Sequence, residues 1–78
     1  MQIVIYTKSG CPNCVTAKRL LDDKGLGYTA YDVETDIGYK KMLGQVDAQY
    51  RQMPQIFING QRVGGLAGLQ AALKELGL

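Results

Sequence analysis

The spacing of apolar and polar residues divides the chain into seven segments of two kinds. Short apolar or alternating runs are typical of strands, and longer stretches with apolar residues three and four apart are typical of helices. Strands are predicted at residues 2–6, 28–33, 55–58 and 61–63, and helices at residues 12–24, 36–43 and 66–76. The predicted element order is therefore β-α-β-α-β-β-α.

Glycine and asparagine mark where these segments end. Gly25, Gly44 and Gly77 follow the three predicted helices, where a glycine C-cap is common. Asn59 and Gly60 separate the last two strands, and this pair is a strong signal for a two-residue hairpin. The first two strands are joined through a helix, so we expect them to be parallel with a right-handed crossover. These connections predict an α/β fold with a four-stranded mixed sheet and three helices.

The helical spacing also predicts which side chains are buried. The inward side of the first helix carries Cys14, so we expect Cys14 to be the more buried cysteine and Cys11 the exposed one. The other residues expected on the buried sides of the helices are Ala17, Leu20, Leu21, Lys24, Ile37, Met42, Leu43, Leu66, Leu69, Ala72, Leu73 and Leu76. Thr35 is the expected N-cap of the second helix. Residues 45–52 are expected to form a loop or a ragged extension of that helix.

Size and charge narrow the classes of function. The 78 residues predict one small domain, 1–78, and 46% of them are apolar, a share typical of globular proteins. The net charge is +2, with basic and acidic residues interspersed, which argues against nucleic-acid binding. No apolar run approaches the ~20 residues of a membrane span, and the first residues lack the charged start of a signal peptide. We therefore expect a cytoplasmic monomer with neither a membrane nor a nucleic-acid partner.

Cys11 and Cys14 carry the candidate chemistry. They stand where the first strand meets the first helix, with Pro12 at the first helical position. Cys11 is then the N-cap, where backbone N–H groups and the helix dipole favour its thiolate. Lys8, three residues earlier, adds a positive charge that acts in the same direction. One cysteine pair in a reducing compartment is more often catalytic than structural.

Other roles for these residues have weaker support or remain open. A zinc site needs about four ligands, but the sequence has two cysteines and no histidine, so we expect no metal. A structural disulfide across two residues closes too short a loop to explain its position. From the residues alone, Lys8 could be a solvated loop lysine and Pro54 could only end a loop. Gly64-Gly65 could be only a tight turn.

Three motifs extend beyond the cysteine pair. They are Tyr6-Thr7-Lys8-Ser9-Gly10-Cys11-Pro12-Asn13-Cys14, Met53-Pro54-Gln55-Ile56-Phe57-Ile58-Asn59-Gly60 and Val63-Gly64-Gly65. In this order and spacing they resemble the glutaredoxins, a family of the thioredoxin-fold superfamily, over essentially the whole chain. The resemblance implies a thioredoxin-like fold, a dithiol thiol–disulfide oxidoreductase and a cis peptide between Met53 and Pro54. Cys11 would attack a substrate disulfide, and Cys14 would resolve the mixed disulfide.

The resemblance also implies glutathione as a co-substrate, with no permanently bound cofactor. The residues at the positions of the family's glutathione site are Lys8, Asn13, Met53, Pro54, Gly65, Leu66 and Ala67. Lys8 would hold a glutathione carboxylate, and the Met53 backbone would pair with the tripeptide as an added strand. The N–H groups at the start of the last helix would receive the γ-glutamyl carboxylate.

The chain departs from many glutaredoxins at two places. Asn13 stands where an aromatic residue is usual between the cysteines. Leu66-Ala67-Gly68 stands where acidic residues after the double glycine hold the glutamyl ammonium. A carboxylate introduced at Gly68 is therefore expected to strengthen the use of glutathione.

Two further functions remain open. In its brevity and in Arg51-Gln52-Met53-Pro54 the chain also resembles the glutaredoxin-like hydrogen donors of ribonucleotide reductase, which take electrons from thioredoxin reductase. The other function is a binding module that bridges an iron–sulfur cluster, although cluster sites in this family favour a single cysteine in the motif. The expected partners are therefore glutathione, disulfide-bearing proteins such as ribonucleotide reductase, and thioredoxin reductase.

Overall fold

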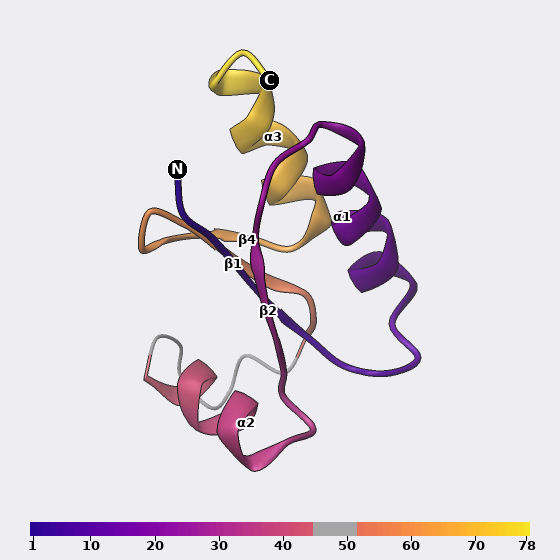
Figure 1. Cartoon of the computed structure of the whole chain (residues 1–78), viewed down its shortest axis with the longest axis vertical. Coiled ribbons are helices and arrows are strands. Elements are labelled where there is room, and N and C mark those ends of the chain that lie inside the picture. The colour runs from indigo at the N-terminus through magenta and orange to yellow at the C-terminus, as the bar shows by residue number, and fades with distance from the viewer. Residues whose placement is uncertain (45–51) are drawn as a thin grey trace.

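A four-stranded mixed sheet forms the centre of the computed structural model, which describes residues 1–44 and 52–78 (Figure 1). The strands are β1 (Ile3–Thr7), β2 (Thr29–Asp32), β3 (Gln55–Ile58) and β4 (Gln61–Gly64), and the helices are α1 (Pro12–Asp23), α2 (Asp36–Leu43) and α3 (Leu66–Glu75). Their order along the chain confirms the predicted β-α-β-α-β-β-α arrangement. The predicted loop at residues 45–52 lies, except for Gln52, outside the described residues.

The pairing of the strands also follows the prediction. In the sheet order β2-β1-β3-β4, β1 is parallel to β2 and antiparallel to β3, and β3 is antiparallel to β4. Asn59 has φ 52° and Gly60 has φ 81°. Positive φ at both positions is what a type I′ turn requires, and this turn matches the twist of the two strands that it joins.

The helices cover the two faces of the sheet unequally. In Figure 1, α1 and α3 lie side by side on one face, and α2 lies on the other. The α1/α3 face buries Ile3, Ile5, Ala17, Leu21, Ile56, Ile58, Leu69 and Leu73. A second buried cluster, to which α2 contributes Met42, consists of Tyr6, Cys11, Cys14, Met42, Met53 and Phe57. The cysteines therefore belong to the smaller apolar cluster, where the Tyr6 ring stacks on Tyr31 with centroids 5.7 Å apart.

Four side chains expected on buried sides of helices are exposed instead. Ile37 is 72% exposed and Leu43 also faces solvent, because the eight-residue α2 places only Gly38 and Met42 in the interior. Leu76 is exposed because α3 ends at Glu75 and Leu76 is its C-cap. Lys24 is likewise the exposed C-cap of α1. Among the described residues, no helix has the length and apolar character needed to cross a membrane.

Two glycines let helices approach strands closely. Gly38 is the third residue of α2, and Gly68 is the third residue of α3. A Cβ atom at Gly38 would overlap the carbonyl oxygen of Asp32, and one at Gly68 would overlap the carbonyl oxygen of Val63. These contacts involve backbone atoms, which cannot move aside as a flexible side chain can. Glycine at these positions therefore sets how closely α2 and α3 pack on the sheet.

Candidate active site

The turn from β1 into α1 holds the two cysteines as the sequence predicts. Cys11 is the N-cap, Pro12 is the first helical residue, and the Cys14 backbone N–H donates a hydrogen bond to Cys11 Sγ at 3.2 Å. The two side chains form a disulfide with Cα atoms 5.3 Å apart. In the reduced protein, the same N–H and the helix dipole would favour the Cys11 thiolate.

The burial of the cysteines differs from the prediction in one respect. Cys14 is the more buried, with 2% of its surface exposed, but Cys11 is also buried, with 8% exposed. Its sulfur is covered by the segment before β3, because the Met53 carbonyl oxygen lies 3.4 Å from Cys11 Sγ. The Met53-Pro54 peptide is cis, as the resemblance implies. Access to the Cys11 sulfur is therefore restricted on the side of Met53.

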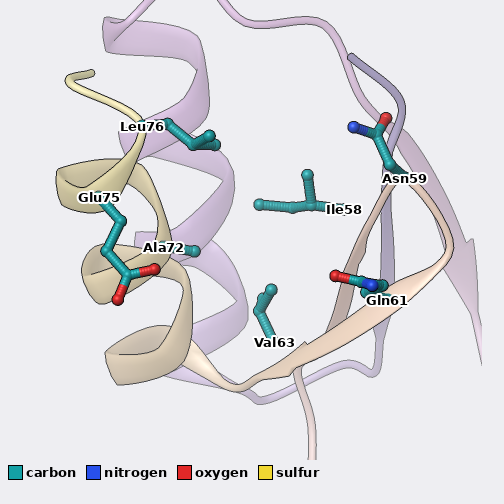
Figure 2. Close-up of a pocket in the computed structure, with 7 residues that line it drawn as sticks. All are labelled: Ile58, Asn59, Gln61, Val63, Ala72, Glu75 and Leu76. Atoms are coloured by element: carbon teal, nitrogen blue, oxygen red, sulfur yellow. The ribbon is translucent and has the colours of Figure 1, made fainter.

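A shallow pocket of about 360 Å³ lies beside Cys11. Its lining residues are Lys8, Gly10, Cys11, Pro12, Asn13 and Met53. The structure therefore places Lys8, Asn13 and Met53 in the same pocket as Cys11. A separate hollow of about 250 Å³ lies between the β3–β4 hairpin and α3 (Figure 2). Ile58, Val63 and Leu76 point into that gap, which contains none of the predicted site residues.

The start of α3 lies next to the cis-proline segment. Gly65 is the N-cap of α3, and a Cβ atom at Gly65 would stand 3.5 Å from the Pro54 carbonyl oxygen. Gly65 has no side chain to cap α3, and within residues 1–44 and 52–78 the N–H groups of its first turn, from Leu66 and Ala67 onward, have no side-chain acceptor. All the predicted site residues therefore lie along one connected region.

Glu34, which no sequence motif singles out, contacts the loop between β1 and Cys11. Its carboxylate accepts a hydrogen bond of 2.7 Å from the Ser9 backbone N–H. The pKa of Glu34 is lowered mainly by a hydrogen bond from the Ser9 side chain and next by the one from the Ser9 backbone. The positive charge of the nearby Lys8 also lowers it. Because β1 and β2 are parallel and adjacent, the segments after them meet at one edge of the sheet. That topology is the signal that could have identified Glu34.

The position of Lys8 predicts a modest effect on the reactivity of Cys11. Lys8→Gln is expected to raise the pKa of the reduced Cys11 thiol and to slow its alkylation at neutral pH by up to about fivefold, because the lysine is exposed and screened. Thiolate absorbance and alkylation rates measured against pH test this. Lys18→Gln, a lysine in the middle of α1, is the control. If the two variants have the same Cys11 pKa and alkylation rate, Lys8 has no effect and the start of α1 alone explains the reactivity of Cys11.

Comparison with known proteins agrees with this geometry. The family model for glutaredoxin matches residues 3–63. Glutaredoxin 1 of Rickettsia conorii is 36% identical over 75 residues, which are 94% of this chain and 72% of that protein. The solved structure of reduced Escherichia coli glutaredoxin has 33% sequence identity and a TM-score of 0.74, and the match covers 96% of this chain and 95% of that one. Fold and cysteine pair together define a thiol–disulfide oxidoreductase of the thioredoxin fold. Within that class, the chain belongs to the glutaredoxin family.

One relative is much longer than this chain. Hybrid peroxiredoxin hyPrx5 of Haemophilus influenzae is 40% identical over 70 residues. The match covers 87% of this chain and 27% of that protein. The similarity therefore concerns one part of the hybrid protein.

Proposed function

We propose that the protein reduces protein disulfides and glutathione mixed disulfides, with glutathione as the reductant. The Cys11 thiolate attacks a substrate disulfide, which releases one half as a thiolate and leaves the other half bonded to Cys11. Cys14 then attacks Cys11 Sγ, releases the second half as a thiol and forms the Cys11–Cys14 disulfide. Two glutathione molecules restore the dithiol and leave as oxidised glutathione. The observation that carries the proposal is the 3.2 Å hydrogen bond from the Cys14 N–H to the Cys11 sulfur.

Glutathione use rests on the groups around Cys11. Lys8 lines the pocket and can pair with a carboxylate, while Asn13 and Met53 form the adjoining wall. Pro54 lies between Met53 and the start of α3. There Gly65, Leu66 and Ala67 form a helix N-terminus that can bind the γ-glutamyl carboxylate of glutathione. The glutamyl ammonium has no acidic partner in Leu66-Ala67-Gly68. Glutathione is therefore expected to be used with a raised KM.

Gly68 is the wrong place to supply that partner. The expectation that Gly68→Asp strengthens glutathione use fails, because any side chain at Gly68 would overlap the Val63 carbonyl oxygen. Ala67 precedes it and is exposed in the first turn of α3, so a carboxylate fits there.

We therefore expect Ala67→Asp to improve glutathione-dependent turnover by up to about fivefold, the value of an exposed ion pair. The rate with thioredoxin reductase should not change. Ala71→Asp places the same charge one turn further along the exposed side of α3 and should have no effect on either rate. Steady-state kinetics with each reductant give the answer. If neither the original protein nor Ala67→Asp uses glutathione, the glutathione proposal is wrong.

The absence of an acidic residue in Leu66-Ala67-Gly68 favours a second candidate function, one that does not depend on glutathione. We propose, as the alternative, a hydrogen donor for ribonucleotide reductase that is recharged by thioredoxin reductase. Met53, from the motif that suggests this role, lines the pocket beside Cys11, whereas Arg51 lies outside the described residues. Turnover with glutathione plus glutathione reductase, compared with turnover with thioredoxin reductase, separates the two candidates. Either role fits the proposed cytoplasmic monomer made of one domain, 1–78.

A further inference from the structure

A buried glutamine stands directly beside the cis-proline segment. Gln55 follows Pro54 as the first residue of β3, and only 3% of its surface is exposed. Its side-chain Nε2 donates a hydrogen bond of 2.7 Å to the Gln52 carbonyl oxygen. Its Oε1 accepts a hydrogen bond of 2.9 Å from Arg62 Nε on β4. A buried amide must have its polar atoms paired, and this one is paired at both ends.

The two partners of Gln55 fix the direction of its amide. Arg62 is a pure donor, so it must face the amide oxygen, and the Gln52 carbonyl is a pure acceptor, so it must face the amide nitrogen. A flipped amide would place a donor against a donor and an acceptor against an acceptor. Arg62 therefore orients the group by which Gln55 holds Gln52.

Residues 52–54 have little other support from the sheet. The ladder between β1 and β3 runs from Ile3 paired with Ile58 to Tyr6 paired with Gln55, and so it stops just after Pro54. Pro54 has no N–H to donate. The Gln55 side chain therefore reaches back past the end of the ladder and holds the segment that precedes it.

This segment carries the oxygen that covers Cys11. Met53 follows Gln52 directly, and its carbonyl oxygen lies 3.4 Å from Cys11 Sγ. A carbonyl at this distance can accept a hydrogen bond from a thiol but repels a thiolate. The Cys14 N–H, in contrast, donates a hydrogen bond to the Cys11 sulfur and so favours the thiolate. The placement of residues 52–54 therefore affects both the ionisation of Cys11 and access to its sulfur.

We propose that Gln55 is a positioning residue for thiol–disulfide exchange: its amide, oriented by Arg62, holds the segment 52–54 so that the Met53 carbonyl stays against Cys11. The proposal rests on exchange at Cys11 and is independent of whether glutathione or a reductase supplies the electrons. Gln55 touches neither sulfur, and it acts through Gln52 and Met53.

Gln55→Met tests this, because methionine has a similar length and can form neither hydrogen bond. We expect KM for a disulfide-bearing peptide to rise about five- to tenfold, the value of one hydrogen bond, because the Met53 backbone that would pair with an extended substrate is no longer held in place. The kcat should change less than about twofold. The pKa of the reduced Cys11 thiol should fall, because the Met53 carbonyl no longer favours the protonated form. Dithiothreitol serves as the reductant, so that a failure of the glutathione proposal would not affect the result.

Ile58→Val is the control, since it weakens the core at the far end of β3. It should lower thermal stability while leaving KM and the Cys11 titration unchanged. If Gln55→Met also leaves both unchanged, the positioning role is wrong. Should Gln55→Met fail to fold, Gln55→Glu carries the test through KM alone. Its carboxylate keeps the bond from Arg62 but repels the Gln52 carbonyl, so an unchanged KM there would equally overturn the proposal.

Discussion

Cys11→Ser is expected to abolish all thiol–disulfide exchange. The substitution removes the sulfur that stands at the N-cap of α1, where the Cys14 N–H donates to it at 3.2 Å. Cys14 cannot replace it, because it lies inside the smaller buried cluster with 2% of its surface exposed. A serine hydroxyl stays protonated at neutral pH and forms no disulfide. Rates with a protein disulfide and with a glutathione mixed disulfide should both fall to the uncatalysed level.

Cys14→Ser is the matched variant, and it should keep one of these two activities and lose the other. Cys11 can still take a glutathionyl group from a mixed disulfide, so this activity is expected to remain. Protein-disulfide reduction is expected to be lost, because no second thiol is left to resolve the intermediate. Equal losses in both variants, or faster alkylation of Cys14 than of Cys11 in the reduced protein, would contradict the assignment of roles.

Gly68→Ala is expected to destabilise the fold by roughly 3 kcal/mol, the upper range for overpacking. Alanine would gain about 1 kcal/mol of helix propensity over glycine. Its Cβ atom, however, would overlap the Val63 carbonyl oxygen and force α3 away from β4. The overlap involves backbone on both sides, so it should outweigh the propensity. Urea unfolding curves of the reduced proteins measure the difference.

Gly27→Ala provides the comparison for this result. Gly27 is exposed in the loop before β2, and a Cβ atom there would meet nothing within 4 Å. The change in unfolding free energy should stay within about 0.5 kcal/mol, as for ordinary surface substitutions. If Gly68→Ala behaves like Gly27→Ala, α3 does not pack as closely on β4 as the structure indicates.

The elements could be predicted because their signals are local. Asn59-Gly60 predicts a hairpin from two adjacent residues, and Thr35 predicts a helix start that the structure confirms through its bond from the Gly38 N–H. Cys11 at the N-cap and Pro12 after it follow from the same kind of reasoning. Much of the site could thus be located from the order of residues alone.

Burial is harder to predict than the helices and strands, because it depends on residues far apart in the chain. The helical spacing predicts an exposed Cys11, yet Met53, 42 residues later, covers it. Glu34 meets Ser9 across 25 residues, which no spacing within one element reveals. Ile37 has the apolar character of a core residue, but an eight-residue helix buries few side chains. The role of Gln55 likewise appears only once β3 and β4 are paired.

The central place of β1 between β2 and β3 has a consequence for the newly made protein. On the ribosome, β1, α1 and β2 emerge before β3, and this part of the chain contains both thiols. The antiparallel partner of β1 is β3, which is synthesised much later. Pairs that distant in sequence close slowly, because the intervening chain must lose its freedom first. Until β3 docks, the nascent thiols lack the Met53 carbonyl, and their oxidation is governed by the surrounding solution instead of by the fold.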